Sequence, residues 1–105
     1  MPTADELCNQ AEQLKEAGQL DEAVAKYQES LAIEPDNVLG HLALSVLLTK
    51  LARHDEAIKH AYRATELEPN DAFGYTSLSI TLQRAGKFLE AEDALARAKM
   101  LQQGY

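Results

Sequence analysis

The sequence predicts an all-α fold built from repeated helix-turn-helix units, and three observations support this prediction. The chain repeats itself, because Pro35 and Pro69 lie 34 residues apart within the near-identical segments 34–37 and 68–71. Apolar residues recur at helical spacing, without the alternating polar and apolar runs of half-buried strands. The composition is 46% hydrophobic but only 6% aromatic, which suits helices that pack closely through small side chains.

The repeat divides the chain into three units, residues 4–37, 38–71 and 72–105, which leave only three residues at the start. The 34-residue step also relates three other sets of positions: Gly18, Ala52 and Gly86; Leu14, Leu48 and Leu82; and Ala23, Ala57 and Ala91. We therefore expect residues 1–105 to form a single domain of three repeats.

The first helix is predicted to begin after Thr3, whose hydroxyl can accept a hydrogen bond from the amide of Glu6. Leu7 and Ala11 begin a narrow apolar stripe on this helix. Gly18 can adopt the left-handed conformation that ends it.

The second helix is predicted to start near Asp21 and Glu22, whose carboxylates favour a helix N-terminus. Its inward face is expected to comprise Ala23, Val24, Tyr27, Leu31 and Ile33. Pro35 ends it, because a proline disfavours helical geometry in the residue before it.

The third predicted helix covers residues 38–51, after a cap by Asp36 or Asn37. Its apolar residues spread over every side, and a helix of this kind must be covered on every side. Because the stretch is too short to span a bilayer, we expect neighbouring protein elements to cover it.

The remaining helices repeat the scheme. Asp55 and Glu56 open the fourth helix, and Asn70 or Asp71 caps the fifth, which ends at Gly86. Residues expected to point inward are Ala57, Ile58, Ala61, Tyr62, Ala64 and Leu67 in the fourth helix, Tyr75, Leu78 and Leu82 in the fifth, and Ala91, Leu95, Ala98 and Leu101 in the sixth.

Six helices in a 34-residue period resemble the tetratricopeptide repeat family over nearly the whole chain. Positions that match the family pattern of alternating large and small residues are Leu7, Ala11, Leu14, Ala23, Tyr27, Ser30 and Pro35 in the first unit, Ser45, Leu48, Ala57, Ala64 and Pro69 in the second, and Tyr75, Ser79, Leu82, Ala91, Leu95 and Ala98 in the third. His41 and Ala61 depart from the pattern, and Gln103 stands where a proline is expected.

The resemblance implies an α-solenoid in the form of a short right-handed superhelix. It also implies a protein-interaction module that binds a peptide or a partner helix in a concave groove. The first helix of each unit lines that groove, so the candidate binding residues are Cys8, Asn9, Glu12, Leu39, Leu42, Val46, Lys50, Phe73, Ser77, Ile80 and Arg84.

The apolar middle of this predicted groove indicates an apolar or amphipathic ligand, such as one face of a helix. Two other interpretations stay open. Leu42, Val46, Leu39 and Phe73 can instead belong to the core, where neighbouring first helices pack on one another. A homodimer can also bury the same surface, which makes a homo-oligomerising structural unit the alternative function.

One branch of the family grips chaperone tails with a carboxylate clamp of lysines, asparagines and an arginine. The equivalent positions here are Cys8, Glu12, Ala43, Phe73 and Ser77, and none of them matches. Glu12 would repel a carboxylate, so we expect no chaperone ligand of this type.

The charge and composition disfavour other classes of partner. With 17 acidic and 10 basic residues the net charge is −7, which argues against binding nucleic acid. No stretch is long enough to cross a membrane, and the start of the chain does not look like a signal peptide. The single cysteine fits a reducing compartment, so we expect a cytoplasmic protein.

The sequence gives little sign of catalysis. It has no glycine-rich phosphate loop or nucleophile elbow, and no histidine pair has zinc-site spacing with Cys8. Glu56 and His60 lie four residues apart, but such a pair on a solvated helix is usually an ion pair or nothing. We expect no enzyme activity, metal or cofactor; a small enzyme or metal-binding protein is the remaining alternative.

Overall fold

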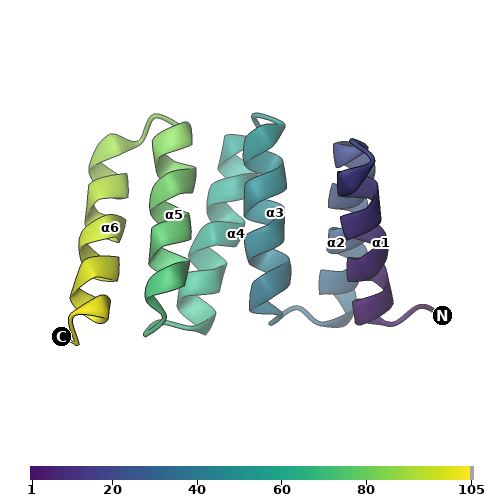
Figure 1. Ribbon diagram of the computed structural model, residues 1–105, viewed down its shortest axis with the longest axis horizontal. Coiled ribbons are helices and arrows are strands. Elements are labelled where there is room, and N and C mark those ends of the chain that lie inside the picture. Colours follow the sequence, from purple (N-terminus) through teal and green to yellow (C-terminus); the bar gives the residue numbers. More distant parts are fainter. Residues whose placement is uncertain (105) are drawn as a thin grey trace.

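The computed structural model describes residues 1–104 and contains six helices: α1 (Ala4–Glu16), α2 (Leu20–Ile33), α3 (Val38–Lys50), α4 (His54–Leu67), α5 (Ala72–Arg84) and α6 (Phe88–Gln102). They stand side by side along the longest axis of a body measuring 43 × 26 × 19 Å (Figure 1). The predicted all-α solenoid is therefore confirmed. The last residue of the third predicted unit, Tyr105, lies outside the described residues.

The helices begin in two ways. Thr3, Asn37 and Asp71 cap α1, α3 and α5, each accepting a bond of 3.0 to 3.3 Å from an amide in the first turn. These bonds satisfy donors that a helix start leaves without an intrahelical partner. The helices α2 and α4 have no side-chain cap, but they carry two acidic residues each in the first turn, as α1 also does, and these complement the helix dipole.

The turns inside the three helix pairs share one backbone conformation. Gly18 and Gly86 have φ angles of 81°, as the sequence predicts, and the equivalent Ala52 has a φ of 59°. The left-handed region is open to glycine but costs an alanine about 1 to 2 kcal/mol, because its Cβ crowds the backbone. The second unit therefore adopts the common turn under strain.

The core is built from alanines at the helix crossings and leucines beside them. Ala11, Ala23, Ala57, Ala61 and Ala91 are at most 1% exposed. Larger side chains that are also fully buried are Leu44, Leu47, Leu48 and Leu82. Small residues let two helix backbones approach, and the leucines fill the space beside each crossing.

Serine hydroxyls reinforce this packing. Ser79 donates a hydrogen bond of 2.9 Å to the carbonyl oxygen of Ala91, which ties α5 to α6. Ser30 donates one of 2.9 Å to the carbonyl oxygen of Ala4, which ties α2 to α1. Both hydroxyls are buried, and a buried hydroxyl needs such a partner to offset its lost hydration.

Three expectations about burial are wrong. The helix α3 is not covered on every side, because Leu39 is 76% exposed and Val46 is 51% exposed. Ile33 and Tyr62, expected to point inward, are 51% and 41% exposed. Ile33 is the last residue of α2, where the chain leaves the packed part of the helix.

Within residues 1–104, no helix combines the length and apolar character that crossing a membrane requires.

We predict that Ala57→Leu lowers the free energy of unfolding by about 1 to 3 kcal/mol, because the added atoms must enter a filled helix crossing. Urea denaturation followed by circular dichroism measures the change. Ala25→Leu is the matched control, since Ala25 is exposed on α2 and its replacement should change stability by less than about 0.5 kcal/mol. Equal stability of the Ala57→Leu variant and the wild type would contradict the packing described above.

We predict that Ala52→Gly raises the free energy of unfolding by about 0.5 to 1 kcal/mol, because glycine relieves the left-handed strain. The control is Ala85→Gly, which should destabilise, since Ala85 has an ordinary φ of −84°. A loss of stability in both variants would show that Ala52 is not strained.

Candidate interaction surface

The candidate surface lies on the first helices of the three pairs. In Figure 1, α2 and α4 lie behind α1 and α3, so that α1 and α3 share a layer. The helix α3 also contacts α5 directly. Because each helix pair is connected in the same way, α1, α3 and α5 run in the same direction, and their C-terminal ends gather at one edge (Figure 1).

Four large apolar side chains are exposed on α3 and α5. Leu39 is 76%, Val46 51%, Phe73 62% and Ile80 50% exposed. Within each helix the two residues lie seven positions apart, which places them on the same side, two turns from each other. We call these four residues the apolar face.

The other predicted groove residues are placed differently. Leu42 is only 8% exposed and belongs to the interior, so its assignment to the groove is corrected. Asn9 and Glu12 are exposed on α1. Cys8 is half-buried, with its Sγ 3.2 Å from the Oγ of Ser30, so it takes part in the contact between α1 and α2.

The structure brings five of the predicted residues together around one pocket. It has a volume of about 170 Å³ and lies between the C-terminal halves of α3 and α5. The residues that line this α3–α5 pocket are Val46, Thr49, Lys50, Ser77, Ile80, Thr81 and Arg84. Ser77 is half-buried, whereas Lys50 and Arg84 are exposed in the last turns of their helices.

The two cations at this pocket are unpaired. Within residues 1–104, Arg53 and Arg63 form ion pairs with Glu56 and Asp36, but neither Lys50 nor Arg84 forms one. Two free positive charges therefore flank an apolar pocket on a chain whose net charge is −7.

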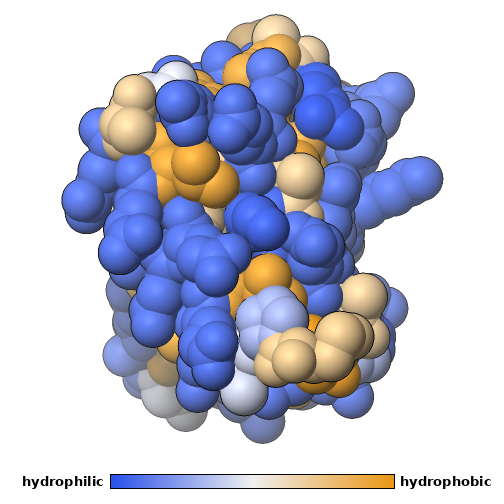
Figure 2. Space-filling model, turned by 90° about the vertical axis from the view of Figure 1, so that its right-hand side faces the viewer, coloured by the Kyte–Doolittle hydropathy of each residue, from blue (hydrophilic) through white to orange (hydrophobic). Residues whose placement is uncertain are grey.

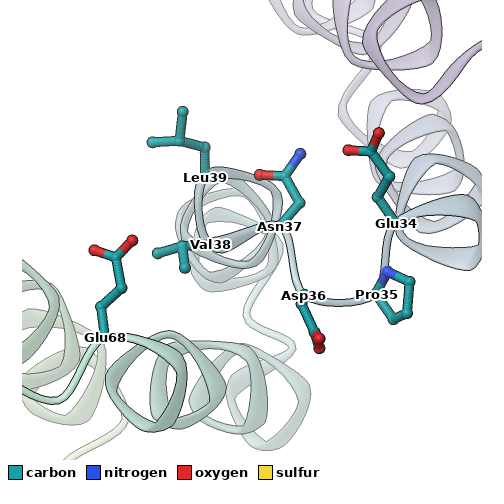
Figure 3. Close-up of a pocket in the computed structure, with 7 residues that line it drawn as sticks. All are labelled: Glu34, Pro35, Asp36, Asn37, Val38, Leu39 and Glu68. Carbon is teal, nitrogen blue, oxygen red and sulfur yellow. The ribbon is translucent and has the colours of Figure 1, made fainter.

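A wider depression lies at the opposite ends of the same helices. It has a volume of about 620 Å³ and is lined by residues 34–39 and Glu68. Figure 3 shows Glu34, Leu39 and Glu68 pointing to one side, whereas Asp36 points to the other. Two carboxylates thus line the same depression as the exposed Leu39, and we call this region the acidic depression.

The end of the array formed by α1 and α2 has a different surface. Figure 2 shows this end, where hydrophilic residues predominate and separate the hydrophobic ones into small patches. Isolated apolar groups of this kind are ordinary on a protein surface. The four large exposed apolar side chains of the candidate surface lie on α3 and α5 instead.

A histidine pair joins α3 to α4, and sequence reasoning missed it. Nδ1 of the buried His41 lies 2.9 Å from Nδ1 of His60, and Nε2 of His41 lies 2.7 Å from the carbonyl oxygen of Pro35. A carbonyl only accepts, so Nε2 of His41 carries a hydrogen, and in the neutral pair Nδ1 of His60 donates to His41. The departure from the family pattern at His41 was the one feature of the sequence that could have indicated an unusual contact here.

The environment of this pair lowers the pKa of His60 below its ordinary value of 6.5. Burial is the main cause, because it penalises the charged imidazolium, and His41 acts in the same direction. Among nearby charges, Glu56 opposes this effect and Lys59 adds to it.

Within residues 1–104, no group of three potential metal ligands lies together.

Comparison with known sequences gives one family. A sequence profile of the tetratricopeptide repeat family matches residues 14–79, which is more than half of the chain. A search of curated protein sequences gives no significant match.

Solved structures with the same fold include three that illustrate the likeness. The second tetratricopeptide domain of Spaghetti (RPAP3), bound to the HSP90 peptide SRMEEVD, has a TM-score of 0.83 at 18% identity, covering 94% of this chain and 92% of that one. YrrB, a protein with an unusual peptide-binding site, has a TM-score of 0.88 at 18% identity, and the match covers 100% of this chain and 54% of YrrB. The Sgt2 tetratricopeptide domain from Aspergillus fumigatus has a TM-score of 0.87 at 17% identity, and the match covers 99% of this chain and 69% of that one. At these identities the likeness establishes the fold alone.

We predict that the histidine pair makes stability depend on pH. Because the pKa of His60 is lower in the folded chain than its ordinary value of 6.5, the unfolded chain binds this proton more readily. The stability that neutral His60 contributes is fully present above pH 6.5 and is lost as the pH falls toward the folded-state pKa. The urea concentration at the midpoint of unfolding should therefore decrease as the pH is lowered from about 7.5 to about 5. The variant His60→Gln should show a smaller decrease over this range.

His54→Gln provides the control for this experiment, because it removes a histidine that lies outside the pair. The measurement compares the slopes of the two variants, and His60→Gln should reduce the slope more than His54→Gln does. If His60→Gln and the wild type lose stability equally over this pH range, the pair is not the source of the dependence.

Proposed function

The chain belongs to the tetratricopeptide repeat family, and from this we propose that residues 1–105 act as one three-repeat module that binds a partner protein. Its ligand is an apolar or amphipathic segment, such as a peptide or one face of a helix. The apolar face on α3 and α5 holds this segment, while Cys8, Asn9 and Glu12 of α1 lie farther along the same row of helices.

The observation that carries the proposal is the repetition of exposed apolar residues at equivalent positions. Leu39 and Phe73 lie 34 residues apart, and so do Val46 and Ile80. Their exposed fractions range from 50% to 76%, so folding alone gains little from their apolar character. A grouped set of exposed apolar side chains is typical of a binding surface, whereas isolated ones need no explanation.

The shape of the surface suits a helix or an extended peptide. Two apolar residues on each of two neighbouring parallel helices offer four anchor points, of which Val46 and Ile80 line the α3–α5 pocket. An amphipathic helix presents matching residues at spacings of three, four and seven. The structures of Spaghetti with a bound peptide and of YrrB with a peptide-binding site support a peptide as the class of ligand.

The proposed ligand is not the chaperone tail that a carboxylate clamp grips. The corresponding positions carry Cys8, Glu12, Ala43, Phe73 and Ser77, none of which is a cation. A carboxylate at this place would meet the negative charge of Glu12. We also propose a non-enzymatic protein of the cytoplasm, in keeping with a single unpaired Cys8.

The alternative is self-association, and a second exposed surface favours it. Phe88, Leu89 and Met100 on α6 are 65%, 80% and 46% exposed. A contact between α6 of one copy and the apolar face of another would bury both. Light scattering coupled to size exclusion, over a wide concentration range, distinguishes the functions, because a stable monomer leaves the apolar face free for a partner.

We predict that Leu39→Asp and Phe73→Asp each abolish binding of an amphipathic peptide and leave helicity unchanged, because both residues are exposed in the free protein. Fluorescence anisotropy measures binding, and circular dichroism measures helicity. Phe88→Asp is the matched control, since Phe88 is comparably exposed on α6 and should not affect binding. Unfolding of the first two variants would place both residues in the core and contradict the proposed surface.

A further inference from the structure

We infer that the α3–α5 pocket binds an acidic segment of the partner, with an aliphatic side chain in the pocket and carboxylates beside Lys50 and Arg84. This inference rests on the proposed function and specifies the chemistry of its ligand. It also fixes the direction in which the partner lies on the apolar face.

The lining of the α3–α5 pocket is mainly apolar. Val46 and Ile80 supply its apolar side chains, and Thr49 and Thr81 supply methyl groups beside hydroxyls. Both threonine hydroxyls already donate a hydrogen bond within their own helix. Thr49 donates one of 2.7 Å to the carbonyl oxygen of Ser45, and Thr81 donates one of 3.0 Å to that of Ser77. The floor of the pocket therefore offers mainly apolar contact, which suits an aliphatic side chain.

Two free cations lie at the rim of the pocket. Lys50 and Arg84 occupy equivalent positions, 34 residues apart, on neighbouring parallel helices. Both line the α3–α5 pocket, and within residues 1–104 neither has an ion-pair partner. Guanidinium and ammonium groups in this arrangement complement carboxylates on a ligand that fills the pocket.

The far end of the apolar face carries the opposite charge. Glu34 and Glu68 point to the same side as Leu39 at the acidic depression (Figure 3). An acidic segment placed there would be repelled, so the two ends of the apolar face favour ligand charges of opposite sign. The acidic end of the partner therefore lies at the C-terminal ends of α3 and α5.

A structural role for the two cations predicts a different result. Cations in the last turn of a helix complement its dipole, and Lys50 and Arg84 also hold these positions. If that were their only role, replacing them would lower stability slightly and would weaken acidic, neutral and basic ligands alike. A preference among ligands by charge is a readout that helix stabilisation does not produce.

Lys50 and Arg84 do not stand at the clamp positions, although one of those positions, Ser77, also lines the α3–α5 pocket. Those positions include Ala43 and Phe73, whereas Lys50 and Arg84 stand in the last turn of each helix. In the proposed complex the ligand therefore binds at one edge of the array, with its aliphatic side chain in the pocket and its carboxylates beside the two cations.

The experiment uses three fluorescein-labelled synthetic amphipathic helical peptides with the same leucine face. One carries glutamates at one end, and the others carry glutamines or lysines at those positions. We expect the glutamate peptide to bind about 3- to 10-fold more tightly than the glutamine peptide, and the lysine peptide to bind most weakly. Added salt should reduce the difference, because these charges are exposed.

The double variant Lys50→Glu/Arg84→Glu should reverse the order of the three peptides. The milder Lys50→Gln/Arg84→Gln should make their affinities similar, and circular dichroism checks that both variants stay helical. The matched control is Lys87→Glu, which changes an exposed cation outside the α3–α5 pocket and should keep the wild-type order.

The outcomes separate this inference from the proposed function. Equal affinity for all three peptides, abolished by Leu39→Asp, would overturn the inference and leave the proposed function standing. Failure of every peptide to bind would overturn both. A dimer that Lys50→Glu/Arg84→Glu dissociates would assign the pocket to a second copy of the chain and overturn the partner inference.

Discussion

The architecture depends on the close approach of paired helices at small residues. Ala23, Ala57 and Ala91 occur once in each repeat, and each is at most 1% exposed. The short side chain lets the backbones meet, so the leucines beside each crossing can fill the remaining space at native density. Since every pair is packed and connected alike, the first helices run in parallel along one side of the array.

The properties of the candidate surface follow from this arrangement. Parallel first helices bring equivalent residues into register, so that a residue exposed in one repeat has its counterpart nearby. Leu39 and Phe73 hold equivalent positions on α3 and α5, and so do Lys50 and Arg84, since the residues of each pair lie 34 positions apart. The turns that precede α3 and α5 place Glu34 and Glu68 at the other end. As a result the apolar face has positive charge at one end and negative charge at the other, and this asymmetry favours one orientation of a charged ligand.

The histidine pair shows how one repeat solves the same packing problem with other residues. His41 is buried at the α3–α4 contact, and its two ring nitrogens reach His60 and the carbonyl of Pro35. A buried ring with polar atoms needs both partners, because an unpaired nitrogen would lose its hydration without return. The second repeat thereby gains a polar link at the position where its sequence departs from the family pattern.

The sequence by itself determined the six helices, the repeat and where the caps lie to within two residues, because these features depend on residues close in the chain. Asn37 and Asp71 act within one turn, and the left-handed turns at Gly18 and Gly86 are local backbone choices. Burial was decided only by the tertiary structure. Leu42 and Val46 are both apolar residues of α3, yet one is 8% and the other 51% exposed, because exposure depends on which neighbouring helix covers each side. The α3–α5 pocket and the His41–His60 bond likewise need two distant segments to meet, which no local pattern specifies.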